Sequence, residues 1–292
     1  MQAVMVASTL ALLSLLIAPV SIVSTAAIAL ITLRKGTGEG FLVLLISVLA
    51  ASFLGMFLFG NFQFALAYGL ILWLPIWLIA ILLRVGRQLS LVVEIAVSLG
   101  VATVIGFYAF NAEPNLIWSE LLNRMLEPML SSAPEHVSVE DMKKSLNVIA
   151  HYMTGIMAAG SVSGLLLGLL LARWWQALLF NPGGFRQEFL TLKTRHAFAL
   201  GTVAVVIVAL MTDGMFSEMA WNVIIPLFVL YTFIGTAVFH VLLAARKAGR
   251  LLLPLFYVVI FVIPQSLIPV ALIGLSDTWL NLRYKILNQT SV

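Results

Sequence analysis

The chain has 292 residues, of which 62% are hydrophobic and 10% are charged, and its mean hydropathy is +1.10. Because a soluble domain carries roughly 25% charged residues, this composition excludes an ordinary soluble protein. The net charge of +4 is spread over short loops, which argues against a nucleic-acid-binding face. The absence of cysteine excludes disulfides, thiol catalysis and thiolate metal sites.

The apolar residues form blocks of about 20 or more, the length that crosses a hydrocarbon core as an α-helix. Helices are expected because every backbone polar group in lipid needs a partner within its own segment. The pattern predicts an all-α, polytopic transmembrane helical bundle, a single integral membrane domain over residues 1–292. Its eight predicted spans are 3–33, 41–59, 64–83, 89–110, 147–172, 196–213, 220–245 and 252–275.

Loop charge orients these spans. Eleven of the 16 lysines and arginines follow spans one, three, five and seven, whereas nine of the 12 acidic residues lie on the opposite side. The positive-inside rule makes the basic side cytoplasmic. With eight crossings, both termini are then expected outside the cytoplasm.

The first span is longer than one upright crossing, and Pro19 lies in its middle. A kinked, tilted helix is one interpretation, and a broken helix that lines a cavity is the other. Ala3, Ala7 and Ala11 recur at every fourth position, a stripe that favours close helix packing or contact with a partner subunit.

Residues 111–146 form the longest hydrophilic stretch and are predicted to be an extracytoplasmic amphipathic insertion between spans four and five. Apolar residues recur at helical spacing from 114 to 130. Such a helix either rests at the membrane surface or forms a lid over an outward cavity, with its apolar stripe facing down. Ser138 is a predicted N-cap for a helix that runs on into span five.

Span five carries a second small-residue stripe, formed by Gly160, Gly164 and Gly168. Stripes of this kind allow helix backbones to approach closely, within the protein or against another membrane subunit. The segment 173–195 follows as a cytoplasmic interfacial loop. Its Asn-Pro-Gly-Gly sequence predicts a turn, and its aromatic residues suit the headgroup level or, alternatively, a docking site for a cytoplasmic partner.

Polar residues at membrane depth are the main functional signal, because they are costly there. Glu94 and His240 are predicted to share a depth near the inner face, where they form an intramembrane pair; alternatively, Glu94 pairs with Arg87 on its own helix. Gln265 lies between two prolines in span eight and needs a partner in hydrocarbon.

A polar mouth is predicted at the outer ends of spans five to seven. The alternative is that residues at these span ends are simply hydrated. Its candidate ligand-binding residues are Asn147, His151, Tyr152, Asp213 and Asn222, and Gln265 in span eight is a separate ligand-binding candidate. The four histidines are scattered, and none has a second ligand at metal-binding spacing, so no metal site or cofactor is expected. No nucleophile–base pair is found, so no enzyme is expected.

The layout resembles the YybS-like family of bacterial inner-membrane proteins. The resemblance covers nearly the whole chain and is carried by the run RWWQALLFNPGGF from Arg173 to Phe185 and by the long insertion before span five. It implies a multi-pass protein of the bacterial inner membrane. More distantly, the chain is similar to the substrate-binding S components of energy-coupling-factor vitamin transporters, which meet their transport partner through an Ala-x-x-x-Ala stripe that Ala3, Ala7 and Ala11 match.

The leading hypothesis is a non-enzymatic membrane protein that binds a small molecule and works with a partner complex in transport. The alternative is a membrane scaffold or assembly factor that binds other membrane proteins. The expected partners are therefore the lipid bilayer, a membrane protein and a small-molecule ligand, but not nucleic acid.

Overall fold

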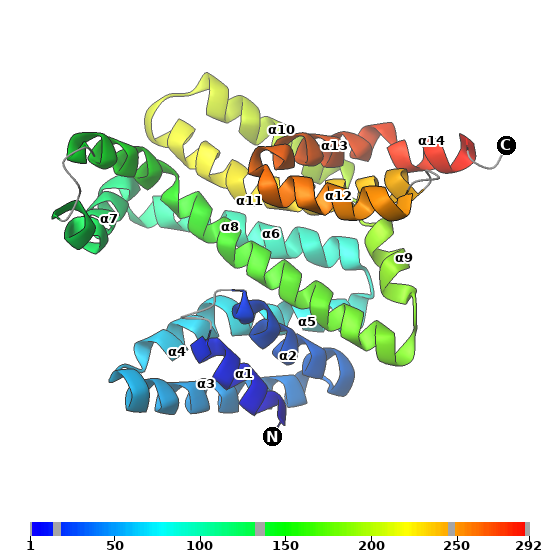
Figure 1. Ribbon diagram of the computed structural model, residues 1–292, viewed down its shortest axis with the longest axis horizontal. Coiled ribbons are helices and arrows are strands. Elements are labelled where there is room, and N and C mark those ends of the chain that lie inside the picture. The colour runs from blue at the N-terminus through cyan, green and yellow to red at the C-terminus, as the bar shows by residue number, and fades with distance from the viewer. Residues whose placement is uncertain (1, 14–18, 132–137, 245–248, 290–292) are drawn as a thin grey trace. The chain divides into compact units, whose positions relative to one another are not determined.

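A computed structural model describes residues 2–13, 19–131, 138–244 and 249–289 of the chain (Figure 1). Within these residues every regular element is a helix, which confirms the predicted all-α class. Five helices there are long and apolar enough to cross a membrane, or six if one bent pair counts as a span. The chain is thus an integral membrane protein by its helices, whereas the count of eight spans stays a prediction.

The long helices are α3 (Thr37–Phe59), α6 (Leu89–Phe110), α8 (Val139–Phe180), α11 (Gly214–Ala244) and a composite of α4 (Gln63–Tyr68), η1 (Gly69–Trp73) and α5 (Leu74–Gly86). The element η1 is a π-helical turn inside this composite span. The sixth predicted span corresponds to α10 (His196–Met211), whose 16 residues reach only about 24 Å. It is therefore shorter than a hydrocarbon core of roughly 30 Å.

Helix α3 shows why these helices suit a lipid environment. Leu49, Phe53 and Phe57 lie along one face of the helix and are 69%, 73% and 79% exposed. The small residues Ser47 and Ala51 are buried on the other face. A continuous exposed apolar face is uncommon on a soluble monomer and marks a surface that meets lipid or another membrane protein.

The chain forms two compact units. The first contains residues 1–96, 161–194 and 230–292, and the second contains residues 97–160 and 195–229. Helices α6, α8 and α11 each contribute residues to both units. The second unit also includes α7 (Pro114–Ser131) and α10.

The first predicted span is a pair of helices, α1 (Gln2–Leu13) and α2 (Val20–Lys35), that pack against each other. The hydroxyl of Ser24 donates to the carbonyl oxygen of Ala7 at 2.8 Å, and the indole of Trp73 donates to the same hydroxyl at 3.1 Å. In one continuous helix Ala7 and Ser24 would lie about 25 Å apart. The kinked-span interpretation is therefore wrong, and the broken helix is what the structure shows; residues 14–18, at the break, lie outside the described residues.

The last predicted span, 252–275, is also divided. Helix α12 (Gly249–Val262) and helix α13 (Leu267–Leu280) meet at an angle of 117°, separated by the 3₁₀ turn η2 (Pro264–Ser266). Pro264 has no backbone N–H to continue the α12 ladder, so the helix ends just before it. The predicted single span at this position is therefore a bent pair.

Local signals in the middle of the chain are confirmed. The Ser138 hydroxyl accepts the backbone N–H of Asp141 at 3.2 Å, as expected of an N-cap. Helix α8 then runs unbroken for 42 residues, through the predicted span and on to Phe180. The Asn-Pro-Gly-Gly turn follows, with Gly183 at a φ of +88°, and α9 (Gly184–Leu190) begins immediately afterwards. The predicted interfacial loop 173–195 is therefore largely helical.

Candidate functional site

The second unit contains a polar cluster built from three long helices. The Tyr108 hydroxyl of α6 donates to Glu218 Oε1 of α11 at 2.8 Å. The other carboxylate oxygen, Oε2, lies 2.8 Å from Nδ1 of His151 on α8. The side chains of His151 and Glu218 remain 43% and 21% exposed. The cluster thus combines a buried phenol with a carboxylate and an imidazole that are accessible from the surface.

Asn222 holds these helices together. Its side-chain N–H groups lie within 3.0 Å of the Tyr108 hydroxyl and of the carbonyl oxygens of His151 and Glu218. Its side-chain oxygen accepts the backbone N–H of Gly155 at 2.6 Å. A side chain on Gly155 would lie 2.5 Å from the Asn222 carbonyl, so only glycine permits this approach of α8 to α11. Because Asn222 is fully buried and fully bonded, its role is structural.

The predicted polar mouth is only partly assembled. His151 and Asn222 come together through Glu218, as just described. Asn147, Tyr152 and Asp213 have exposed side chains outside this cluster. Sequence reasoning missed Glu218 and Tyr108. The position of Glu218 one helical turn before Asn222 is a signal that could have found it, whereas Tyr108 stands in an apolar span without any local mark.

The apolar stripe of the predicted lid is partly exposed. Leu116 and Met125 of α7 are 55% and 68% exposed, whereas Leu122 and Leu126 are half-buried. The polar side of α7 lines a cleft of about 690 Å³ together with the first turns of α8. The lining residues are Glu120, Asn123, Arg124, Glu127, Val139, Lys143 and Asn147. Helix α7 is attached to α8 by Trp118, whose indole N–H donates to the Thr154 hydroxyl at 2.8 Å. The exposed stripe suits a helix that rests at a membrane surface.

The three polar residues predicted at membrane depth lie in different settings. His240 Nε2 is 2.6 Å from the Tyr257 hydroxyl, so the structure gives this imidazole a partner other than the predicted Glu94. Glu94 is 1% exposed. Gln265 lies in the 3₁₀ turn between α12 and α13, and its side chain is exposed.

The small-residue stripes lie mainly against other helices of the chain. Ala7 and Ala11 are buried, whereas Ala3 is half-buried. A side chain on Gly168 would lie 2.4 Å from the Thr25 hydroxyl of α2, whereas Gly164 has only ordinary contact with Leu72. A side chain on Gly160 would meet no atom of the described residues within 4 Å. The contact made by this stripe is therefore close at Gly168 and becomes looser toward Gly160.

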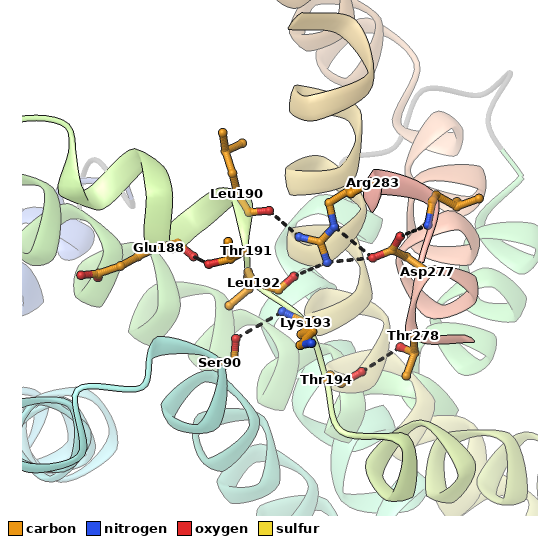
Figure 2. A network of polar contacts seen from close by, with 11 residues as sticks. Ser90, Glu188, Leu190, Thr191, Leu192, Lys193, Thr194, Asp277, Thr278 and Arg283 are labelled. Carbon is orange, nitrogen blue, oxygen red and sulfur yellow. Dashed lines mark hydrogen bonds and ion pairs between the residues drawn. The ribbon is translucent and has the colours of Figure 1, made fainter. Parts of the chain in front are cut away.

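Figure 2 shows a further polar network in the first unit. Arg283, in α14 (Leu282–Gln289), donates to Asp277 Oδ2 from Nε at 3.0 Å and from Nη2 at 2.7 Å. The same guanidinium group donates to the carbonyl oxygens of Leu190 and Leu192. The side chains of Asp277 and Arg283 are only 4% and 12% exposed. Nearby, the hydroxyls of Thr194 and Thr278 lie 3.1 Å apart.

This network joins two segments that the predicted topology separates, with 173–195 in the cytoplasm and the C-terminus outside. Direct hydrogen bonds link residues 190–194 to residues 277–283. The bend between α12 and α13 lies between the predicted span 252–275 and this contact.

The arrangement defines a helical membrane protein with a Tyr–Glu–His cluster whose carboxylate and imidazole reach the surface. No group of three or more histidine, cysteine, aspartate or glutamate side chains in the described part of the chain could hold a metal ion. No family model, curated protein or solved structure matches the chain.

Proposed function

We propose that the chain is a small-molecule-binding component of a transport system in the bacterial inner membrane, with its site at the Tyr108–His151–Glu218 cluster. The observation that carries this proposal is a carboxylate placed at the meeting point of three apolar helices, yet still partly exposed. Ionisable groups are costly in membrane segments and commonly mark ligand or ion pathways. The resemblance to the YybS-like family supports the inner-membrane location, and the more distant resemblance to transport S components supports the transport role.

The chemistry of the cluster favours a ligand that carries a positive charge or an N–H donor. Glu218 is the one formally charged member unless His151 is protonated, and each carboxylate oxygen accepts a hydrogen bond from a different neighbour. A cationic ligand would replace the imidazole at Oε2, because the His151 side chain is more exposed than the carboxylate that it contacts. Charge-assisted hydrogen bonds to carboxylates are among the stronger polar contacts in proteins.

We expect the variant Glu218→Gln to lose a bound small molecule that the native protein retains. The amide keeps the size of the side chain but removes the charge, so a cationic ligand loses on the order of 1.5–3 kcal/mol, or about tenfold or more in affinity. Native mass spectrometry of protein extracted gently from its own membrane measures the retained mass directly.

Asp213→Asn is the matched control, because it removes an exposed carboxylate outside the cluster. An adduct lost equally from both variants would contradict the assignment of the site. The same spectra distinguish the alternative function: a native protein that carries only protein partners and no small molecule would identify a membrane scaffold instead.

We also propose that both termini are cytoplasmic. The segment 173–195 contains Arg173, Arg186, Lys193 and Arg195, and the C-terminal helix is bonded to it. At the other end, α1 and α2 reach only about 18 Å and 24 Å, so neither crosses a core of roughly 30 Å. The N-terminus then lies on the same side of the membrane as Arg34 and Lys35, which follow α2.

A reporter that fluoresces only in the cytoplasm should therefore be bright when it is fused after Val292. The eight-crossing topology gives the opposite result, a dark fusion at this position. A fusion after Phe110, at the end of the full-length span α6, is the control and should be dark.

A further inference from the structure

Four arginine side chains converge on one pocket of about 570 Å³ in the first unit. Arg34 comes from the last turn of α2, Arg84 and Arg87 come from the end of α5, and Arg173 comes from α8. Glu188 is the one carboxylate among the lining residues, so the formal charge of the lining is +4 − 1 = +3. The remaining lining residues are Leu33, Leu83 and Gln176.

Two of these arginines are held in place by the protein. Arg173 donates to both carboxylate oxygens of Glu188 and also to Gln176 Oε1, the latter at 2.7 Å. Arg84 donates from Nη1 to the Leu33 carbonyl oxygen at 2.6 Å. This contact satisfies one of the carbonyl groups that the end of α2 leaves without a helical partner. These two guanidinium groups therefore form a rigid wall for the pocket.

The other two arginines are free to bind. The Arg34 guanidinium stacks over the ring of Phe180, with its carbon atom 4.8 Å from the ring centre. Arg87 ends α5 in a left-handed conformation with a φ of +51°. Neither forms an ion pair with a carboxylate of the described residues. Basic residues at helix ends commonly anchor a protein at the cytoplasmic headgroups. This anchoring role explains why basic residues occur here. It does not explain why four arginines converge on one cavity that has a single carboxylate.

We propose that this arginine pocket binds a phosphate-bearing anion, with Arg34 and Arg87 as its direct contacts. The planar guanidinium group matches phosphate oxygens with two parallel hydrogen bonds. The held pair, Arg84 and Arg173, adds positive potential without having to reorganise. The phosphate belongs either to the headgroup of an anionic lipid or to a soluble compound. This site lies within the first unit and is independent of the Tyr108–His151–Glu218 cluster.

The test uses the full chain in a neutral detergent and has two arms. In the soluble arm, inorganic pyrophosphate is titrated at constant ionic strength and its binding is measured by calorimetry. In the lipid arm, phosphatidylglycerol and phosphatidylcholine are added in turn, and retained lipid is measured by native mass spectrometry. We expect the native protein to bind in one arm, with phosphatidylglycerol preferred over phosphatidylcholine if that arm is the lipid one.

The double variant Arg34→Gln/Arg87→Gln should weaken that binding by about tenfold or more, because it removes two charge-assisted contacts. Lys35→Gln is the matched control: it removes a neighbouring positive charge that does not line the pocket, and should change the affinity by less than about twofold, as expected for a screened surface charge. Arg34→Lys/Arg87→Lys keeps the charge but not the paired hydrogen bonds, and should fall between these two results while preserving the fold.

Binding in neither arm by the native protein would overturn the proposal. So would an equal loss in the double variant and in Lys35→Gln, because it would show that the overall basic surface attracts the anion. If only pyrophosphate binds, the source is soluble; if only phosphatidylglycerol binds, the source is the lipid headgroup.

Discussion

Replacing Arg283 by alanine is expected to destabilise the protein by about 3–5 kcal/mol, the usual cost of leaving a buried charge without its partner. Asp277 is 4% exposed and receives two hydrogen bonds from Arg283, so its carboxylate would keep only the backbone N–H of Leu282. The carbonyl oxygens of Leu190 and Leu192 would lose their donor as well. Thermal unfolding of the purified protein in detergent measures the effect.

The double variant Asp277→Asn/Arg283→Ala separates charge from packing. A neutral amide is much cheaper to bury than a carboxylate, so the double variant should be clearly more stable than Arg283→Ala alone. If the two variants unfold at the same temperature, the loss of stability comes from the lost packing of the arginine side chain and not from the unpaired carboxylate.

Replacing Gly235 by leucine is expected to have the second large effect, because α11 and α13 touch at this residue. A side chain on Gly235 would begin 1.9 Å from the carbonyl oxygen of Val270. Gly274 on the facing helix is equally confined, at 2.2 Å from the carbonyl oxygen of Tyr231. Neither obstacle is a flexible side chain, so the helices must separate. Overpacking costs about 1–3 kcal/mol and sometimes more.

Gly160→Leu is the matched control for this crossing. Gly160 is also in a long helix, but a side chain there would meet no described atom within 4 Å. It should leave the thermal stability of the purified protein nearly unchanged, whereas Gly235→Leu should lower it. Equal effects would mean that helix propensity, and not the close approach, determines the result.

Features that depend on a few neighbouring residues could be predicted from the sequence. The Ser138 cap, the Asn-Pro-Gly-Gly turn and the helix at 114–131 follow from hydrogen bonds and spacing within one segment. The apolar blocks likewise identify the long helices, because burial in lipid depends on composition alone.

Features that depend on distant segments could not be predicted in this way. Tyr108 and Glu218 are 110 positions apart, and nothing near Tyr108 in the sequence signals a carboxylate partner. The way α7 lies against α8 could not be predicted, because an amphipathic pattern shows that a helix has two faces but not which face meets the protein. The divided last span differs from the prediction, and the sequence left the first span open between a kinked and a broken helix, because length and hydropathy do not record whether a chain continues or turns back at a proline.

The bend between α12 and α13 has a consequence for how the protein is made. Each arm has 14 residues, about 21 Å, so neither offers the insertion machinery a helix of full membrane length. The C-terminal arms must therefore enter the bilayer by docking onto α11, which has already been synthesised and presents Gly235. Until Arg283 arrives, the carbonyl groups of Leu190 and Leu192 lack the donor that they have in the finished protein. Formation of the Arg283 network thus follows the docking of α13, and a chain stalled before it presents cellular proteases with an unfinished surface.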